Sequence, residues 1–367
     1  MILDALLLAV GLAVLIGGAE VLVRGASRLA LAVGLTPLVV GLTVVAFGTS
    51  APELAVSIGA GRAGLDGLAL GNVVGSNVFN VLFILGLTAV IAPLVVARQL
   101  VRLDVPVMIG ASALVVALAA DGRIGPLDGA LLAVGLVAYL GWLLYAGRRP
   151  KSEATTGNRA GAAVVAPARP RARLAVDLGL VAGGLVLLVL GSRWLVDGAT
   201  GVAGALGVSD LIVGLTIVAA GTSMPEVATS VVATLRGQRD LAIGNVVGSN
   251  VFNLLGILGI AALATPGGLA VPAAVSAFDV WVMLAVAVVC LPIFVSGLGI
   301  ARWEGVVLLV GYVAYAATLV RLAATGAVAP DPVALAWALG VPTAVLLMVG
   351  LGPSIARIRV RIARRPS

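Results

Sequence analysis

The sequence predicts an all-α integral membrane protein, built as a ten-helix bundle of two inverted five-helix repeats with one extra C-terminal transmembrane helix. Three observations predict this fold class: the composition, a series of long apolar stretches and an internal repeat. Hydrophobic side chains make up 61% of the 367 residues and charged side chains only 11%, whereas a water-soluble domain carries about 25% charged residues. This composition argues against a water-soluble fold.

Apolar stretches long enough to cross about 30 Å of hydrocarbon, at about 20 residues each, recur along the whole chain. Eleven are predicted, at Ile2–Val23, Thr36–Gly61, Leu68–Leu94, Val105–Ala120, Leu127–Ala146, Leu174–Val196, Leu211–Leu235, Leu241–Ala264, Val280–Val295, Gly305–Val320 and Val333–Leu351. The fourth and the ninth are the shortest.

The first stretch has a second interpretation, a secretory signal peptide that is removed from the mature protein. Asp4 stands where a signal peptide carries positive charge, and Glu20 and Arg24 stand where it carries the small residues of a cleavage site. We therefore expect a transmembrane helix there.

The one long connection, residues 147–173, divides the chain into halves. It is rich in Arg, Pro, Ala and Ser, a composition that cannot bury a core and is typical of a linker. Its basic residues are Arg148, Arg149, Lys151, Arg159, Arg169, Arg171 and Arg173. By the positive-inside rule this linker faces the cytoplasm.

If the predicted stretches cross the membrane in alternating directions on either side of the linker, 19 of the 23 basic residues lie on the same side of the membrane as the linker. The N-terminus is then outside and the C-terminus cytoplasmic, in a multi-pass protein of the cell inner (plasma) membrane. The net charge of +7 is accounted for by cytoplasmic loops, and no nucleic-acid partner is expected.

The chain also repeats itself. Gly41–Leu87 aligns without gaps on Gly214–Ile260 at an offset of 173 residues, with 30 of 47 positions identical, and both copies contain GNVVGSNVFN. The predicted divisions are a first five-helix repeat (1–146), a basic linker (147–173), a second five-helix repeat (174–325), and the extra helix with a basic tail (326–367).

An odd number of spans in each repeat makes the second copy enter the membrane from the opposite side, so that a pseudo-two-fold axis in the membrane plane relates the halves. Matching segments then meet near the middle of the membrane, where transporters of this kind place their substrate site. The eleventh stretch has no counterpart in the repeat, and we expect a peripheral helix.

Histidine is absent and Cys290 is the only cysteine. These counts exclude zinc sites of imidazole or thiolate, iron–sulfur centres and histidine-dependent nucleophilic catalysis. No enzymatic activity and no cofactor are therefore predicted. Any metal ion must be bound by oxygen atoms, which suit hard cations such as Ca²⁺, Mg²⁺ and Na⁺.

Two glutamates lie deep within predicted spans at equivalent positions of the repeat, Glu53 in GTSAPE and Glu226 in GTSMPE. An ionisable group at membrane depth marks a functional site by default. The alternatives are protonated acids or acids paired with arginine, but neither span contains a basic residue. Two carboxylates brought together would repel, and a divalent cation between them removes the repulsion.

Further oxygen atoms accompany these glutamates. Hydroxyl and amide groups come from Thr49, Ser50, Thr222, Ser223, Asn80 and Asn253. Pro52 and Pro225 lack an amide hydrogen, so the carbonyl oxygens of Gly48 and Gly221 lose their helical donor and are expected to bind cations. This pool is large enough for Ca²⁺, which takes about six to eight oxygen ligands.

The glycine-rich runs have a packing interpretation, because small residues let membrane helices approach closely. Packing does not account for the polar side chains in the same runs. These are Asn72, Ser76, Asn77 and Asn80, with Asn245, Ser249, Asn250 and Asn253 in the second copy. We expect them to line an ion pathway, whereas a phosphate-binding loop is disfavoured because neither run ends in Lys-Ser or Lys-Thr.

With its duplicated GTSxPE and GNVxGSNxFN motifs, the sequence resembles the cation/Ca²⁺ antiporter superfamily, in particular the prokaryotic Na⁺/Ca²⁺ exchanger branch. The resemblance covers about the first 325 residues. It implies a ten-helix core that binds Ca²⁺ or Na⁺ alternately, with Glu53 and Glu226 as principal Ca²⁺ ligands helped by Thr49 and Thr222. The Na⁺ ligands or pathway groups that it implies are Ser50, Ser223, Ser76, Ser249, Asn80 and Asn253, with carbonyl oxygens from Ala46 and Ala219.

Two features depart from the family pattern. Some members carry an aspartate where this chain has Asn253, so this site has two acidic groups only. The extra C-terminal span also lies outside the ten-helix pattern.

The predicted function is secondary active antiport of Ca²⁺ against Na⁺ across the lipid bilayer, by alternating access at a site between the two repeats. An H⁺-driven Ca²⁺/cation exchanger of the same fold is the nearest alternative, because glutamates can take protons instead of Na⁺. A passive cation channel is an alternative of another class, and the inverted repeat argues against it.

Overall fold

The computed structural model describes residues 2–147, 171–206, 219–273, 275–295 and 297–327. Most of the predicted linker, the first part of the seventh stretch (Leu211–Leu235), the eleventh stretch (Val333–Leu351) and the basic tail lie outside the described residues.

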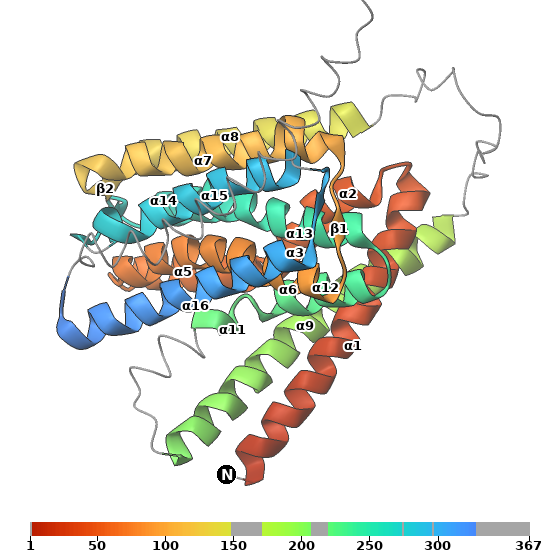
Figure 1. Ribbon diagram of the computed structural model, residues 1–367, viewed down its shortest axis with the longest axis horizontal. Coiled ribbons are helices and arrows are strands. Elements are labelled where there is room, and N and C mark those ends of the chain that lie inside the picture. The colour runs from red at the N-terminus through yellow and green to blue at the C-terminus, as the bar shows by residue number, and fades with distance from the viewer. Residues whose placement is uncertain (1, 148–170, 207–218, 274, 296, 328–367) are drawn as a thin grey trace, which may run out of the picture.

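The described part of the chain is almost entirely helical (Figure 1). Its first half consists of α1 (Ile2–Val33), α2 (Pro37–Val40), the π-helical turn η1 (Gly41–Val45), α3 (Ala46–Thr49), α4 (Ala51–Arg62), α5 (Asp66–Phe79), η2 (Asn80–Leu85), α6 (Gly86–Ile91), β1 (Leu94–Val95), η3 (Leu100–Asp104), α7 (Val105–Leu118), η4 (Ala119–Asp121), β2 (Arg123–Ile124) and α8 (Pro126–Gly147). Its second half consists of α9 (Arg171–Ala205), α11 (Ala219–Gly221), α12 (Met224–Leu235), α13 (Arg239–Val251), η6 (Phe252–Ile257), α14 (Leu258–Ala264), β3 (Leu269–Ala270), η7 (Val275–Asp279), α15 (Val280–Val295), β4 (Gly299–Ile300) and α16 (Arg302–Thr325).

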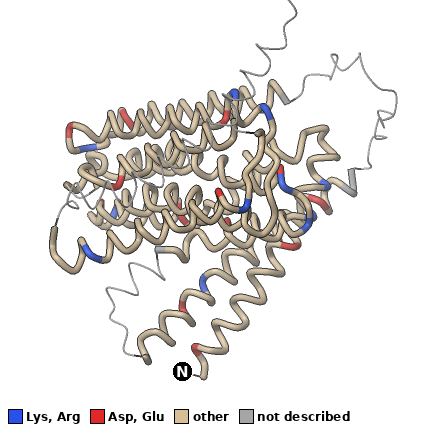
Figure 2. The backbone as a smooth tube through the Cα atoms, in the orientation of Figure 1, with Lys and Arg blue, Asp and Glu red and all other residues tan. Residues whose placement is uncertain are grey.

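Within this described part, eight helices are long and apolar enough to cross a membrane, or nine if one bent pair counts as a single span. Figure 2 shows that most charged residues lie at the ends of the helices, with few along the middle of the bundle. The prediction of an all-α, multi-pass membrane protein is confirmed at this level. The ten-helix arrangement of two inverted repeats stays a prediction.

Two helices extend beyond their predicted ends. α1 continues past Val23 to Val33, and α9 continues past Val196 to Ala205. At about 1.5 Å per residue, the 32 residues of α1 are longer than the hydrocarbon layer is thick. The apolar pattern therefore marked only the part of each helix that suits the hydrocarbon, and the helices continue beyond it.

The fourth and ninth spans are also longer than predicted, because they begin at Leu100 and Val275 with the π-helical turns η3 and η7. The predicted spans stopped short of the acidic residues Asp104 and Asp279. Each of these carboxylates accepts a hydrogen bond from a tyrosine hydroxyl on a later helix, at 3.0 Å in both cases. The donors allow the helices to carry an acidic residue where the sequence pattern alone predicts an end.

α1 and α9 lie side by side and antiparallel, and the end that carries Ile2 and Ala205 projects away from the other helices (Figure 1). Glycines seven residues apart lie at the contact between them: Gly11, Gly18 and Gly25 in α1, and Gly184, Gly191 and Gly198 in α9. A Cβ atom at Gly18 would lie 2.8 Å from the backbone nitrogen of Leu188. These glycines therefore permit an approach of the two backbones that any larger residue would prevent.

Two breaks in the helices place the predicted acidic residues. The second span bends by 44° between α3 and α4, with Ser50 at the break. Pro52 occupies the first turn of α4 and Pro225 the first turn of α12, where proline is tolerated because the amide hydrogen of that turn is not needed. As a result, Glu53 and Glu226 both lie in a first helical turn.

Two short antiparallel pairings join connections of the first half to connections of the second. β1 pairs with β4, with Leu94 opposite Ile300, and β2 pairs with β3, with Ile124 opposite Leu269. The main apolar core is contributed by both halves, and α5 and α13 are buried in it over most of their length. Most polar residues of the glycine-rich runs on these two helices, Ser76, Asn77, Asn245, Ser249 and Asn250 among them, are therefore enclosed by protein.

Candidate cation site

The site is centred on two carboxylates at the starts of two helices. The side chains of Glu53 and Glu226 are 0% and 1% exposed. The first turn of a helix favours a carboxylate, because unpaired amide groups give that end a partial positive charge. Neither residue forms an ion pair with any basic side chain among the described residues, so the arginine-paired alternative finds no support there.

Hydrogen bonds across the two halves hold these carboxylates in one cluster. Ser50 Oγ donates to Glu226 Oε1 over 2.9 Å, and Ser223 Oγ donates to Glu53 Oε1 over 2.8 Å. Each glutamate is thus held by a serine that precedes the other glutamate. The two exchanged hydrogen bonds therefore link the carboxylates of the two halves through one pair of serines.

A second pair of exchanged hydrogen bonds lies next to the first. Thr49 Oγ1 donates to Asn245 Oδ1 over 3.1 Å, and Thr222 Oγ1 donates to Asn72 Oδ1 over 3.3 Å. Thr49 is 1% exposed, and Thr222 is half-buried. Both predicted threonines therefore lie beside the carboxylates, engaged by asparagines of the glycine-rich runs.

Asn72 and Asn245 also brace the helix breaks. Asn72 Nδ2 donates to the backbone carbonyl of Glu53 over 3.0 Å and to Ser57 Oγ over 2.9 Å. Asn245 Nδ2 donates in the same way to Ser230 Oγ over 3.0 Å. Both asparagines were predicted to line the pathway, whereas the two serines were not predicted, although they stand at equivalent positions of the repeat.

The remaining predicted amides and hydroxyls lie on α5, η2, α13 and η6. Asn253 Nδ2 donates to Ser76 Oγ over 2.9 Å, and Asn80 Nδ2 donates to Asn250 Oδ1 over 3.1 Å. Ser249 is fully buried. These contacts again join the two copies of the repeated motif.

Several oxygen atoms of this cluster are buried and have no hydrogen-bond donor within the described part. They are Glu53 Oε2, Glu226 Oε2, Asn80 Oδ1, Asn253 Oδ1 and Ser249 Oγ. Burying such atoms without a partner is costly, and each is expected to have one in a native protein. The carboxylate and amide oxygens can only accept, so a cation satisfies them as well as a donor does.

The backbone carbonyl oxygens that were predicted to bind cations accept more hydrogen bonds than expected. The carbonyl of Gly221 accepts a hydrogen bond from Ser192 Oγ over 2.6 Å, so the expectation that Pro225 leaves it free is wrong. The carbonyl of Ala46 accepts from the amide of Ser50 over 3.1 Å. Ala219 is the first residue of α11, and its side chain lies outside what the structure describes.

No group of three or more acidic, histidine or cysteine side chains suited to a metal ion occurs among the described residues. The cluster thus carries two acidic groups surrounded by neutral oxygens. Such a site suits a hard cation that neutralises two charges, or two monovalent ones.

The sodium/calcium exchanger protein family matches residues 3–145 and 176–321 of the chain. The chain is similar to a putative antiporter, CaxA, of Alkalimonas amylolytica, with 38% identity over 86% of this chain and 98% of the relative. It is similar to the sodium/calcium exchanger MaX1 of Methanosarcina acetivorans, with 33% identity over 86% of this chain and 97% of the relative. It is also similar to a solved structure of the sodium-calcium exchanger NCX_Mj, with a TM-score of 0.71, 30% identity and coverage of 84% of this chain and 95% of that one.

Proposed function

The chain belongs to the sodium/calcium exchanger family and is a Ca²⁺/cation antiporter, and we propose that it exchanges Ca²⁺ for Na⁺ at the cluster around Glu53 and Glu226. The observation that carries this proposal is the set of buried oxygen atoms without a donor, contributed by both glutamates, Asn80 and Asn253. Ca²⁺ and Na⁺ are hard cations that take such ligands. A bound cation removes both the repulsion of the carboxylates and the cost of the unpartnered oxygens.

The other ligands are hydroxyl and carbonyl oxygens around this centre. Thr49 and Thr222 assist the glutamates in binding Ca²⁺, and the Na⁺ ligands or pathway groups are Ser50, Ser223, Ser76, Ser249, Asn80 and Asn253, with carbonyl oxygens of Ala46 and Ala219. The hydroxyls of Ser50 and Ser223 already donate to the carboxylates, so each still has lone pairs to offer a cation.

Competition for one cluster becomes exchange because the empty site carries two negative charges. Moving that charge through the apolar barrier is costly, so the protein changes conformation readily only when cations are bound. α1 and α9 are the elements that move, because they pack closely on each other, and of these two helices only α1 makes an extensive contact with α12. Ca²⁺ then leaves to the side on which the site is open, Na⁺ binds from that same side, and the loaded site opens to the other side, where Na⁺ leaves.

Paired contacts support an inverted-repeat arrangement with residues 1–146 and 174–325 as the repeats. The hydrogen bond of Ser50 with Glu226 has its equivalent in that of Ser223 with Glu53, at positions 173 residues apart. The β1–β4 and β2–β3 pairings are also equivalent, because Leu94 corresponds to Leu269 at an offset of 175 residues and Ile124 to Ile300 at an offset of 176. With the basic connections in the cytoplasm, the N-terminus is outside and the site lies between the repeats.

Ion flux into proteoliposomes tests the function. An outwardly directed Na⁺ gradient is expected to drive uptake of radiolabelled Ca²⁺ that saturates with Ca²⁺ and stops when internal Na⁺ is replaced by choline. Uptake driven by a pH gradient without Na⁺ would establish the H⁺-driven alternative. Flux that needs no counter-ion and does not saturate would establish a channel and overturn the proposal.

The bracing asparagines provide a second test. Asn72→Ala removes a donor to the Glu53 carbonyl and to Ser57, leaving buried groups unpartnered at a cost of about 1–3 kcal/mol. We expect Ca²⁺ affinity to fall by roughly tenfold to a hundredfold, measured by isothermal titration on the purified protein. Asn245→Ala is expected to act alike. Ser112→Ala, which removes a buried hydroxyl bonded within its own helix, serves as the control and leaves affinity unchanged.

A further inference from the structure

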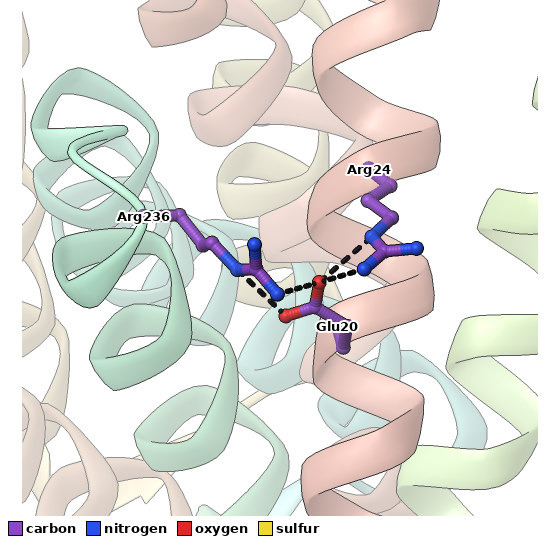
Figure 3. A network of polar contacts seen from close by, with 3 residues as sticks. All are labelled: Glu20, Arg24 and Arg236. Atoms are coloured by element: carbon purple, nitrogen blue, oxygen red, sulfur yellow. Dashed lines mark hydrogen bonds and ion pairs between the residues drawn. The ribbon is translucent and has the colours of Figure 1, made fainter.

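An ion network joins the two halves between α1 and the end of α12 (Figure 3). Glu20 lies on α1, and Arg24 lies one turn later in the same helix, with its Nε 2.7 Å from Glu20 Oε1. Arg236, which directly follows α12, donates from Nε to Glu20 Oε2 over 3.0 Å and also contacts Oε1 through Nη2. The guanidinium of Arg236 thus meets the carboxylate with two of its nitrogen atoms, the geometry that makes such pairs directional.

The network connects α1 to the helix that carries a candidate cation ligand. Glu226 lies in the first turn of α12, and Arg236 is the residue that ends this helix. A continuous helix transmits displacement along its axis, so the position of Arg236 is fixed relative to Glu226. Holding Glu20 against Arg236 therefore fixes this part of α1 relative to the site.

The positions equivalent to Glu20 and Arg236 in the other repeat cannot form the same network at the opposite face of the membrane. At the offset of 173 residues, Glu20 corresponds to Arg193, and Arg236 corresponds to Ala63, next to Arg62. An arginine stands where the acidic partner would be needed, and no basic residue stands at the other position. Among the described residues at the equivalent positions, the same attraction is consequently not available at the opposite face of the membrane.

We infer that Arg236 is a positioning residue that binds Glu20 when α1 is closed against α12, and that this contact favours the conformation closed at this face over the one closed at the opposite face. The inference rests on the proposed exchange by alternating access. An interaction that is present in only one of two conformations shifts the equilibrium between them. It therefore makes the exchanger asymmetric although its two repeats are alike.

The strength of the Glu20–Arg236 pair is expected to depend on how far its side chains are exposed to solvent. The side chains of Arg236 and Arg24 are 55% and 60% exposed, and that of Glu20 is 23% exposed. Exposed pairs are weak, and the two-atom geometry puts this one toward the upper end of their range. Removing the pair is expected to change the ratio of the two conformations roughly two- to fivefold.

Thiol accessibility measures this ratio. Cys290 is the only cysteine and is buried, so Cys290→Ala gives a background without thiols. Ala233→Cys then places a thiol on α12, at a buried position in the apolar cluster that α1 and α12 share. In proteoliposomes with this face outward, Arg236→Gln is expected to raise the rate of labelling by a membrane-impermeant maleimide roughly two- to fivefold.

Two controls separate pairing from a general loss of charge or structure. Arg239→Gln removes a basic residue three positions away and is expected to leave the labelling rate unchanged. Glu20→Arg combined with Arg236→Glu restores opposite charges and is expected to restore the slow rate. An unchanged rate in Arg236→Gln, or an equal rise in Arg239→Gln, overturns the inference.

Transport kinetics give a second, independent readout. In Arg236→Gln the Ca²⁺ concentration for half-maximal exchange is expected to fall at this face and to rise at the opposite one, because each face sees a different fraction of the competent conformation. A change of the same sign at both faces overturns the inference. Since Arg236→Gln retains exchange whereas Glu53→Gln is expected to lose it, failure of the network and failure of the proposed cation site are distinguishable.

Discussion

Glu53→Gln or Glu226→Gln is expected to abolish Na⁺-driven Ca²⁺ uptake in proteoliposomes. Glutamine has nearly the shape of glutamate and can still accept the hydrogen bond that Ser223 or Ser50 donates, so the loss is one of charge alone. Removing one charge from a fully buried cluster costs several kcal/mol in interaction with a cation, which corresponds to a loss of roughly a hundredfold or more in affinity. Uptake should fall to the level of liposomes without protein.

The chain supplies a matched control for this result. Glu304 is also buried, at 5% exposure, but it caps the start of α16, where its Oε2 accepts from the amide of Ala301 over 2.7 Å. Glutamine serves equally well in that role, so Glu304→Gln should fold and exchange Ca²⁺ as the unaltered protein does.

The two site substitutions should also behave as one unit. Because both carboxylates hold the same ion in the proposed site, the double variant is expected to be no worse than either single variant. Retention of more than roughly a tenth of the uptake rate in either single variant is incompatible with a cation held between the two glutamates.

Glu53 and Glu226 could be predicted as the central residues of the candidate site because the same motif occurs once in each repeat. Glu53 and Glu226 stand after the same Gly-Thr-Ser and the same proline, and a proline in the first turn of a helix fixes where that helix begins. The structure places both glutamates in such turns and joins each to the serine of the other half. Sequence and structure agree here because local chain geometry decides the position.

Partners far apart in the chain could not be predicted in this way. The hydropathy pattern predicted that the fourth span begins after Asp104. Average hydropathy does not reveal that Tyr139, 35 residues later, donates a hydrogen bond to that carboxylate. The carbonyl of Gly221 was expected to be free, but Ser192 occupies it. Ser192 corresponds to Ala19 in the first repeat, so this contact has no equivalent that the repeat could have revealed.

The spacing of glycines in α1 and α9 was equally visible in the sequence, but the role of these glycines depends on which helices meet.

Gly18→Leu is expected to separate α1 from α9. A side chain at Gly18 would begin 2.8 Å from the backbone nitrogen of Leu188 and 2.9 Å from Cβ of Leu187, and backbone atoms cannot turn aside as a flexible side chain can. Overpacking of this kind costs about 1–3 kcal/mol, and the contact extends over both helices.

The adjacent glycine makes the test specific to that contact. At Gly17 a Cβ atom would meet no described heavy atom within 4 Å, so Gly17→Leu adds the same apolar side chain to the same helix at a position that leaves room for it. We expect Gly18→Leu to lower the unfolding temperature of the detergent-purified protein and to slow Na⁺-driven Ca²⁺ uptake, while Gly17→Leu does neither. In the proposed exchange α1 and α9 move as a pair, so a Gly18→Leu variant that matches Gly17→Leu in both measurements would show that their close approach is dispensable for exchange.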